Sequence, residues 1–267
     1  MARIDNLTNF LTDVSTAIKT KGGTSSPIPA SEFDTAITNL PGADIDWVAL
    51  GYTTTPQVLL DGYAYAKQIK DNWTTPTAMW STYYNDRNLM FFPMVDTSKV
   101  EYFNGTFNNC SKLIYVPQID TSSATDMSSM FVSCPALTSV PTLDTSKVTS
   151  MYMMFTTDYS LKSIGNFDTH SVTNFYRTFY NCTSLENVPV LNLSSATTIG
   201  DMFYGCSKLT DQSLDNVLQS CITATSYTGA KRLNVLGFNA SRVPYEKVIS
   251  LPHYQDFVDA GWEVGYY

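Results

Sequence analysis

Residues 137–155 read LTSVPTLDTSKVTSMYMMF, and this pattern returns along the chain with a period of 24 residues. The leucines that begin each copy show the period: Leu89, Leu113, Leu137, Leu161, Leu185 and Leu209. One phenylalanine holds its place in every full copy: Phe107, Phe131, Phe155, Phe179 and Phe203. A fixed period in this range indicates stacked units that bury their apolar faces only against their neighbours. The sequence therefore predicts a solenoid of five 24-residue repeats.

Each repeat has three recognisable blocks. The LxxV block at the start predicts a short strand that the following proline ends. The DTS block is typical of a turn, because Asp and Ser side chains bond to nearby backbone N–H groups. Met127, Met130 and Phe131 have the i, i+3, i+4 spacing of one helical turn that packs inward. We therefore expect an α+β repeat solenoid.

The blocks LxxVP, DTS and MxxMFxxC resemble the bacterial-surface leucine-rich repeats of BspA-like proteins, including a group found in gut bacteria and their phages. The resemblance covers residues 89–209 and implies a leucine-rich-repeat-like solenoid. The pattern differs from the general leucine-rich repeat by about one residue near the proline, so the curvature of the solenoid stays open. Some copies vary: Gly165 stands in place of Pro, Asp158 in place of Cys, and Asn192 in place of Asp.

The repeats, residues 89–208, lie between two expected caps. Residues 43–88 are interpreted as an N-terminal cap with a degenerate repeat, and residues 61–69 within it as a short helix. Residues 209–267 are interpreted as an α/β C-terminal cap, since solenoids need atypical terminal units to cover the open core. This cap is expected to contain a helix with the stripe Leu214, Val217, Leu218 and Cys221, a strand with Leu233 and Val235, and a helix with Tyr254, Phe257 and Val258.

Residues 1–42 have a different pattern and form an expected helical arm for attachment or oligomerisation. Apolar residues at helical spacing mark two amphipathic helices: Leu7, Phe10, Leu11, Val14 and Ile18 in the first, Phe33 and Ile37 in the second. Such helices need a partner or a second copy of the chain, and a flexible leader is the alternative. The arm resembles the N-terminal attachment segments of virion proteins from phages of gut bacteria, which implies docking on a tail, baseplate or capsid.

Composition excludes several function classes. The net charge of −8 and the scattered basic residues argue against a nucleic-acid partner and against a basic membrane-binding patch. The longest apolar stretches fall short of the ~18 residues of a membrane span. The first residues lack the apolar core of a signal peptide, so we expect no export signal and a place in a virion.

Residues that could carry chemistry are few. The two histidines, His170 and His253, occur without a CxxC or HxxxH pattern, and neither a GxSxG elbow nor a phosphate-binding glycine loop is found. A Ser-His-Asp site is left open by spacing alone. We expect no catalytic residue, no metal ligand, no cofactor and no enzymatic activity.

Two polar columns follow from the period. Asp96, Asp120, Asp144 and Asp168 recur once per repeat, either as a row of Ca²⁺ sites or, as we favour, as caps of their own turns. Cys110, Cys134, Cys182 and Cys206 form the other column. Parallel side chains fit disulfide geometry poorly, so these cysteines are expected to be buried free thiols.

Tyrosine is the surplus residue, with 17 in the chain. Tyr is amphipathic and rigid, which suits recognition surfaces and stacking on carbohydrate, although it can also simply cover the edges of the coils. The candidate binding residues lie where the repeats vary: Tyr102, Tyr115, Tyr152, Tyr159, Tyr176, Tyr180 and Tyr204.

These observations favour a phage virion protein that adheres to a host surface receptor or glycan. The arm would dock on other virion proteins, and the chain would form a homo-oligomer, with a trimer as the expectation for a fibre. A bacterial surface adhesin is the alternative, and a glycan-degrading tail enzyme is a third hypothesis.

Overall fold

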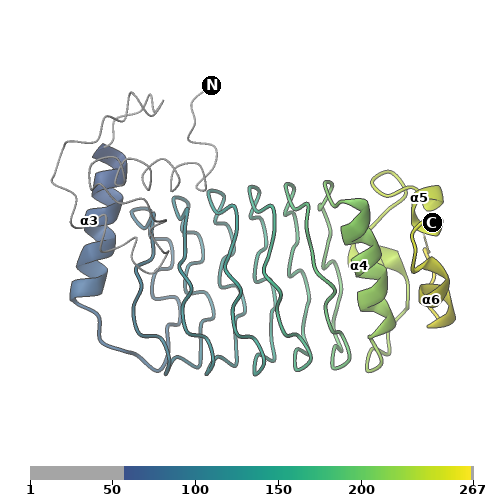
Figure 1. Cartoon of the computed structure of the whole chain (residues 1–267), viewed down its shortest axis with the longest axis horizontal. Coiled ribbons are helices and arrows are strands. Elements are labelled where there is room, and N and C mark those ends of the chain that lie inside the picture. Colours follow the sequence, from purple (N-terminus) through teal and green to yellow (C-terminus); the bar gives the residue numbers. More distant parts are fainter. Residues whose placement is uncertain (1–56, 266–267) are drawn as a thin grey trace, which may run out of the picture.

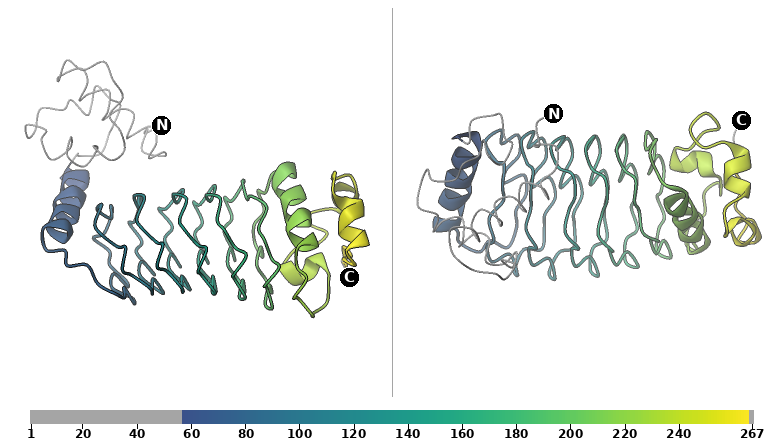
Figure 2. Two further views of the ribbon diagram at one scale, coloured as in Figure 1. Left: turned by 60° about the horizontal axis from the view of Figure 1, so that its bottom comes forward. Right: turned by 45° about the horizontal axis from the view of Figure 1, so that its top comes forward.

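The computed structural model describes residues 57–265. Its helices are α3 (Gln57–Asp71), α4 (Asp211–Ile222), the 3₁₀ helix η3 (Leu233–Leu236), α5 (Tyr245–Ile249) and α6 (Tyr254–Asp259). Between α3 and α4 the chain winds into coils that lie side by side in one row (Figure 1). Two further views place α3 at one end of this row and α4, α5 and α6 at the other (Figure 2). The predicted attachment residues in 1–42 lie outside the described residues.

Parallel bridges join each coil to the next at intervals of 24 residues. One column of bridges connects Ala78, Tyr102, Asp126, Ser150, Asn174 and Thr198. A second column includes the pairs Phe91–Tyr115, Ser139–Ser163 and Ser163–Asn187. The second column falls in the LxxV block, where we predicted a short strand. These are isolated bridges, and no longer strand occurs in residues 57–265, so the prediction was wrong in its extent.

The MxxMF block forms turns with left-handed residues, and the predicted helical turn was wrong. Ser129 and Ser133 have φ of +56° and +58°, which no right-handed helix contains. The N–H groups of Ser129, Phe131 and Ser133 donate to the carbonyls of Tyr152, Met154 and Thr156 in the next coil, at 2.8, 2.9 and 2.9 Å. Alternate N–H groups therefore bind the neighbouring coil, whereas in a helix all of them would bind within the segment.

The core is a continuous column of stacked rings. The ring centroids of Phe107, Phe131 and Phe155 follow each other at 5.5 Å, and Phe179 and Phe203 continue the column at 5.6 and 5.4 Å. All five side chains are buried, as the period predicted. Residues outside the regular repeats extend the column at both ends: Tyr83 stacks on Phe107, and Phe238 stacks on Phe203. Each ring is thus covered on both faces by neighbouring rings.

Helix α3 lies against the first coils and includes residues 61–69, where we predicted a helix. Ala66 packs with Met90 and Phe91 in a small apolar cluster. Gly62 permits this approach, because a Cβ there would lie 2.9 Å from Met90 Sδ. The Tyr65 hydroxyl donates to Asp86 Oδ2 at 2.7 Å, which fixes the helix to the first turn.

Helix α4 closes the other end with side-chain hydroxyls. The N–H groups of Val188 and Leu191 donate to Ser213 Oγ and Ser220 Oγ at 3.0 and 2.8 Å, and Leu193 N–H donates to Thr223 Oγ1 at 2.7 Å. In the first repeat the N–H group equivalent to that of Val188, the one of Phe92, donates to Tyr115 O of the next coil at 3.1 Å. The hydroxyls of this helix and its C-cap therefore satisfy backbone groups that the last coil would otherwise leave unpaired.

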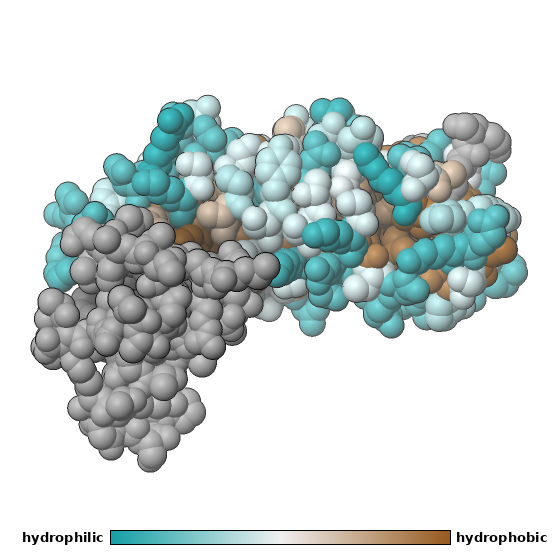
Figure 3. All heavy atoms as spheres, turned by 90° about the horizontal axis from the view of Figure 1, so that it is seen from above, coloured by the Kyte–Doolittle hydropathy of each residue, from teal (hydrophilic) through white to brown (hydrophobic). Residues whose placement is uncertain are grey.

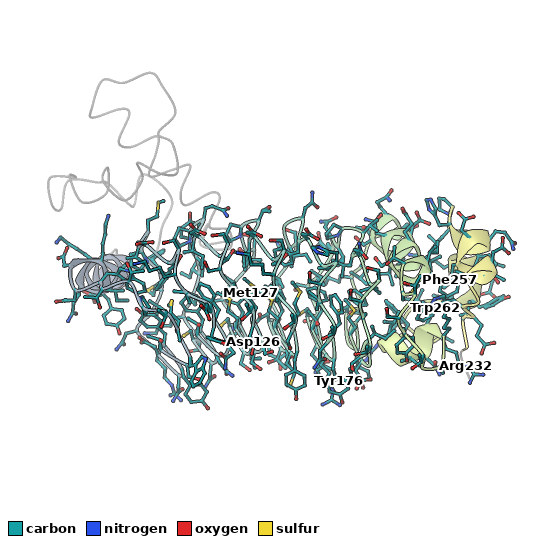
Figure 4. All side chains as sticks on the ribbon, turned by 90° about the horizontal axis from the view of Figure 1, so that it is seen from below. Asp126, Met127, Tyr176, Arg232, Phe257 and Trp262 are labelled. Atoms are coloured by element: carbon teal, nitrogen blue, oxygen red, sulfur yellow. The ribbon has the colours of Figure 1, made fainter. Side chains whose placement is uncertain are left out.

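The remaining C-terminal unit corrects two predictions. Leu233 and Val235 lie in the 3₁₀ helix η3 and form no strand, because Leu233 and Leu236, three residues apart, are the buried pair. In α6 Phe257 is buried but Val258 is exposed. Figure 4 shows Phe257 beside Trp262, and their ring centroids are 5.9 Å apart. Helix α5 was not predicted.

The outer surface of the described part is mixed in character. Figure 3 shows hydrophilic and near-neutral side chains over most of one face, with hydrophobic residues visible between them, more of them toward the C-terminal unit. Within residues 57–265 no helix combines the length and the apolar composition that crossing a membrane requires.

Candidate binding surface

The register of the coil determines which side chains point outward. Along residues 150–157 the side chains of Met151, Met154 and Phe155 are buried, whereas Tyr152 is 37% exposed. Residues 24 positions earlier or later point inward or outward in the same way, because each bridge aligns residues 24 apart. Variable residues at the position of Tyr152 therefore form a column along one side of the stack.

Four of the predicted tyrosines come together on this side. Tyr152 and Tyr176 stack with centroids 5.9 Å apart, and Tyr180 and Tyr204 stack at 4.8 Å. Arg177 joins the two pairs, since its guanidinium lies 4.8 Å from the ring centroids of both Tyr176 and Tyr180. Figure 4 shows Tyr176 at the outer edge of the stack. We name Tyr152, Tyr176, Arg177, Tyr180 and Tyr204 the tyrosine–arginine cluster.

Charged neighbours hold the cluster in place. Arg177 donates from Nε and Nη2 to Asp201 Oδ2 of the next coil, at 3.2 and 3.1 Å. Arg242, from the C-terminal unit, lies 4.8 Å from the ring centroid of Tyr204. A guanidinium over an aromatic face adds about 0.5–1 kcal/mol at an exposed site. The exposed rings are therefore ordered before any ligand arrives.

The other three predicted tyrosines lie elsewhere, so the seven do not form one surface. Tyr102 contacts Trp80 edge to face, with centroids 5.9 Å apart, near the N-terminal end of the stack. Tyr115 packs against the small cluster beneath α3, where burial raises its pKa. Tyr159 is half exposed and lies just beyond the turn of its coil.

Sequence reasoning missed Arg177, Asp201, Arg242 and Trp80 as members of this side. A signal for the first pair was present, because Arg177 and Asp201 are one period apart and follow Tyr176 and Gly200 in the same register. Trp80 and Arg242 lie outside the regular repeats, where the period gives no register.

The aspartate column caps its own turns. Asp96 Oδ1 accepts the N–H of Ser98 at 3.0 Å, and Asp144 Oδ1 accepts that of Ser146 at 3.0 Å. The serine hydroxyls and these N–H groups lower the pKa of both carboxyls. Asn192 makes the same bond to Ser194. The turn interpretation is therefore confirmed, and no three potential ligands gather as a metal site in the described part of the chain.

The cysteine column consists of free thiols. Cys134 Sγ donates to Phe107 O at 3.0 Å, and Cys182 Sγ donates to Phe155 O at 2.9 Å, in each case to a residue 27 positions earlier. Cys110, Cys206 and Cys221 are also free and buried. Burial raises the pKa of Cys110 and Cys206 to about 12. These thiols are therefore packing groups with very little thiolate character.

Asp158 takes the place of cysteine in this column. Its carboxyl is fully buried, and Oδ1 accepts the N–H of Cys134 at 2.6 Å. Oδ2 is also buried and has no hydrogen-bond partner. Burial raises the pKa of this carboxyl well above its ordinary value.

Two histidines contact carboxylates, but neither pair lies in an enclosed site. His170 Nδ1 is 2.7 Å from Asp168 Oδ1, and His170 Nε2 is 2.9 Å from Ser171 Oγ. This Asp–His–Ser chain lies within one exposed turn, where water competes for every bond. His253 Nδ1 is 2.7 Å from the buried Asp215 Oδ2, which attaches the segment before α6 to α4.

One family model matches the chain, and its description is Mycoplasma protein of unknown function, DUF285. The matches cover residues 77–138 and 101–217, which together are just over half of the chain, and they begin one period apart. The match is consistent with the resemblance to BspA-like repeats. No curated protein and no solved structure is found to match the chain.

Proposed function

Because the chain belongs to the DUF285 family, whose description assigns no function, we propose its role from the geometry of its surface. It is a non-catalytic adhesion protein. Its repeats form a leucine-rich-repeat-like solenoid of turns and isolated bridges that holds the tyrosine–arginine cluster toward a receptor or glycan on a cell surface.

The observation that carries this proposal is the stacking of exposed aromatic side chains on one another. Tyr152 and Tyr204 remain 37% exposed although each stacks on a second tyrosine. Tyr and Arg are the residue types that dominate binding energy at protein surfaces, together with Trp. Side chains that are already ordered lose little further entropy on binding. The cluster thus has the composition and the rigidity of a recognition surface.

Placement in a phage virion is the second part of the proposal. It rests on the resemblance of residues 1–42 to attachment segments of virion proteins. These residues would dock on a tail, baseplate or head, and the chain would act as a homo-oligomer, with a trimer expected. A bacterial surface adhesin is the alternative. Genes for tail or capsid proteins beside this gene would favour the virion, whereas genes for surface anchoring would favour the adhesin.

The adhesion proposal is tested by binding of the fluorescently labelled full chain to a panel of gut-bacterial isolates. We expect saturable binding to some isolates and its loss in a variant with both Tyr176→Ala and Tyr180→Ala. Tyr159→Ala is the matched control, because it removes a tyrosine ring that is half exposed and lies outside the cluster. No binding to any isolate, or equal binding by all three proteins, would reject the cluster as an adhesive surface.

A further inference from the structure

The C-terminal end of the stack is closed by hydrogen bonds to an irregular segment. Two N–H groups of the last coil, those of Asp201 and Phe203, donate to carbonyls of η3 at 2.7 and 2.8 Å. In the coil before it the equivalent groups, those of Arg177 and Phe179, donate to the last coil itself. A segment without the repeat conformation can therefore complete an end of this stack.

The N-terminal end of the stack presents a row of carbonyls. The N–H groups of Met79, Ser81 and Tyr83 donate to the second coil, at 2.8, 3.1 and 3.0 Å. The carbonyls that alternate with these N–H groups have equivalents in every later coil, and there each accepts an N–H group of the coil before it. In the first coil no donor among the described residues reaches them. We name the four exposed residues that carry these carbonyls the acceptor edge: Ala78, Trp80, Thr82 and Tyr84.

The interior of the first coil is open at the same end. Thr82 is exposed, whereas its equivalents in the later coils are all buried: Thr106, Met130, Met154, Thr178 and Met202. Tyr83 stacks on Phe107 with one face and is only partly buried. A pocket of about 320 Å³ lies here, with Ile69 of α3 and Trp73 on one side and Thr82 and Tyr83 on the other. An apolar side chain that enters this pocket would complete the core.

The acceptor edge restricts what can cover it. A regular β-strand presents both N–H and C=O groups along each edge, so its carbonyls would meet carbonyls here. The same end of a second copy would bring two acceptor edges face to face. The other end of a second copy is covered by η3 and α4 (Figure 2). The occupant must therefore offer N–H groups at every second residue, together with an apolar side chain for the pocket.

The chain enters the described part of the structure beside this edge. Tyr65, in the middle of α3, bonds to Asp86 at the far end of the first turn. Gln57, where α3 begins, lies about 12 Å further along the helix axis. Residues 43–56 precede it and lie outside the described residues. At ~3.3 Å per residue they span up to about 46 Å, which is enough to return along the whole edge.

The composition of this segment fits the requirements of the edge. Residues 43–56 read ADIDWVALGYTTTP, so every position before Pro56 carries an N–H group. Trp47 and Leu50 are large apolar side chains within it. The rings of Trp73 and Tyr83 in the pocket wall suit an aromatic side chain such as that of Trp47.

We propose that residues 43–56 dock on the acceptor edge, donate alternate N–H groups to its carbonyls and place Trp47 in the pocket. The segment then closes this end as η3 closes the other. It also fixes residues 1–42 to the end of the row opposite the tyrosine–arginine cluster, so the cluster lies at the far end from the attachment arm.

Hydrogen exchange of the ¹⁵N-labelled full chain, followed by NMR residue by residue, tests this docking. We expect alternate amides within residues 43–56 to exchange about tenfold or more slowly than in an isolated peptide of the same residues. Thr82→Trp, which fills the pocket, and Trp47→Asp, which removes the apolar side chain, should each abolish this protection. Ser207→Trp places the same ring on an exposed residue at the other end and should leave the protection unchanged.

The slow exchange of residues 89–209 shows that each variant is folded, and Trp47→Asp changes no residue of the stack. Fast exchange throughout residues 43–56 of the unchanged protein would overturn the proposal. So would protection that survives both Thr82→Trp and Trp47→Asp, because the segment would then be ordered elsewhere. Protection that increases with protein concentration would identify a second copy as the occupant and reject docking within one chain. The measurement needs no receptor, so its result is separate from that of the adhesion assay.

Discussion

Replacing Asp158 with Asn should stabilise the protein at neutral pH and leave it unchanged near pH 4. The side chain occupies the cysteine column, where each thiol donates to a carbonyl 27 residues earlier. For position 158 that acceptor is Phe131 O, and no donor to this carbonyl is found among the described residues. A protonated Oδ2 at Asp158 would supply the missing donor. Asn would supply the same donor from its amide without needing a proton.

The sign of the pH dependence follows from the raised pKa of Asp158. Burial is the main cause of this raised pKa, only the Cys134 N–H group acts against it, and no cation among the described residues stabilises the charged form. Between the unfolded pKa of ~3.9 and the higher folded pKa, only the folded chain keeps the proton. The free energy of unfolding therefore falls as pH rises through this window, by up to about 1.4 kcal/mol per pH unit, and is constant above it.

The measurement is the difference in unfolding free energy between Asp158→Asn and the unchanged protein, from urea titrations followed by tryptophan fluorescence between pH 4 and pH 8. Taking this difference removes the contribution of Asp96 and Asp144, because both proteins contain these carboxyls. Their pKa values are lowered, so they contribute a loss of stability as pH falls, opposite in sign to the effect of Asp158. Asp144→Asn is the matched control, since Asn192 already serves in an equivalent turn. A constant difference for Asp158→Asn across this range would refute the reasoning.

Three further changes test the packing and the backbone. Phe155→Ala should cost about 3–5 kcal/mol in urea unfolding, because its ring contacts Phe131 and Phe179; a change near zero would contradict the core assignment. Ser220→Ala should cost about 1–3 kcal/mol by leaving Leu191 N–H unpaired, whereas the exposed Ser207→Ala should be neutral. Thr157→Asn should raise the unfolding free energy by about 1 kcal/mol, since Thr157 is β-branched at φ +64°; a lower melting temperature would refute this, and Thr173→Asn serves as the control outside the left-handed position.

The 24-residue period made the buried side chains predictable. Residues that recur at one position meet their equivalents in the next coil, so the burial of Met127, Met130 and Phe131 follows from the repeat without knowledge of the backbone path. The path itself was predicted wrongly at this block. Spacing of i, i+3, i+4 also fits two successive turns with left-handed residues at Ser129 and Ser133. Serine gives no local signal for that conformation, unlike glycine.

The candidate site was predictable only in part for the same reason. Tyr152 and Tyr176 share a register, and their stacking follows from the period. Whether Tyr115 or Tyr159 joins them depends on which way each position faces, which requires the backbone. The partners Trp80 and Arg242 come from the irregular ends, where local sequence carries no register.

The hydroxyl groups of α4 have a consequence for self-association. A stack whose last coil offered free N–H groups would act as a template for the first coil of another molecule, and chains would polymerise end to end. Ser213, Ser220 and Thr223 occupy three of these donors, those of Val188, Leu191 and Leu193, so an incoming chain cannot bind them. The same three side chains that complete the fold therefore also keep this end of the protein from growing into a filament.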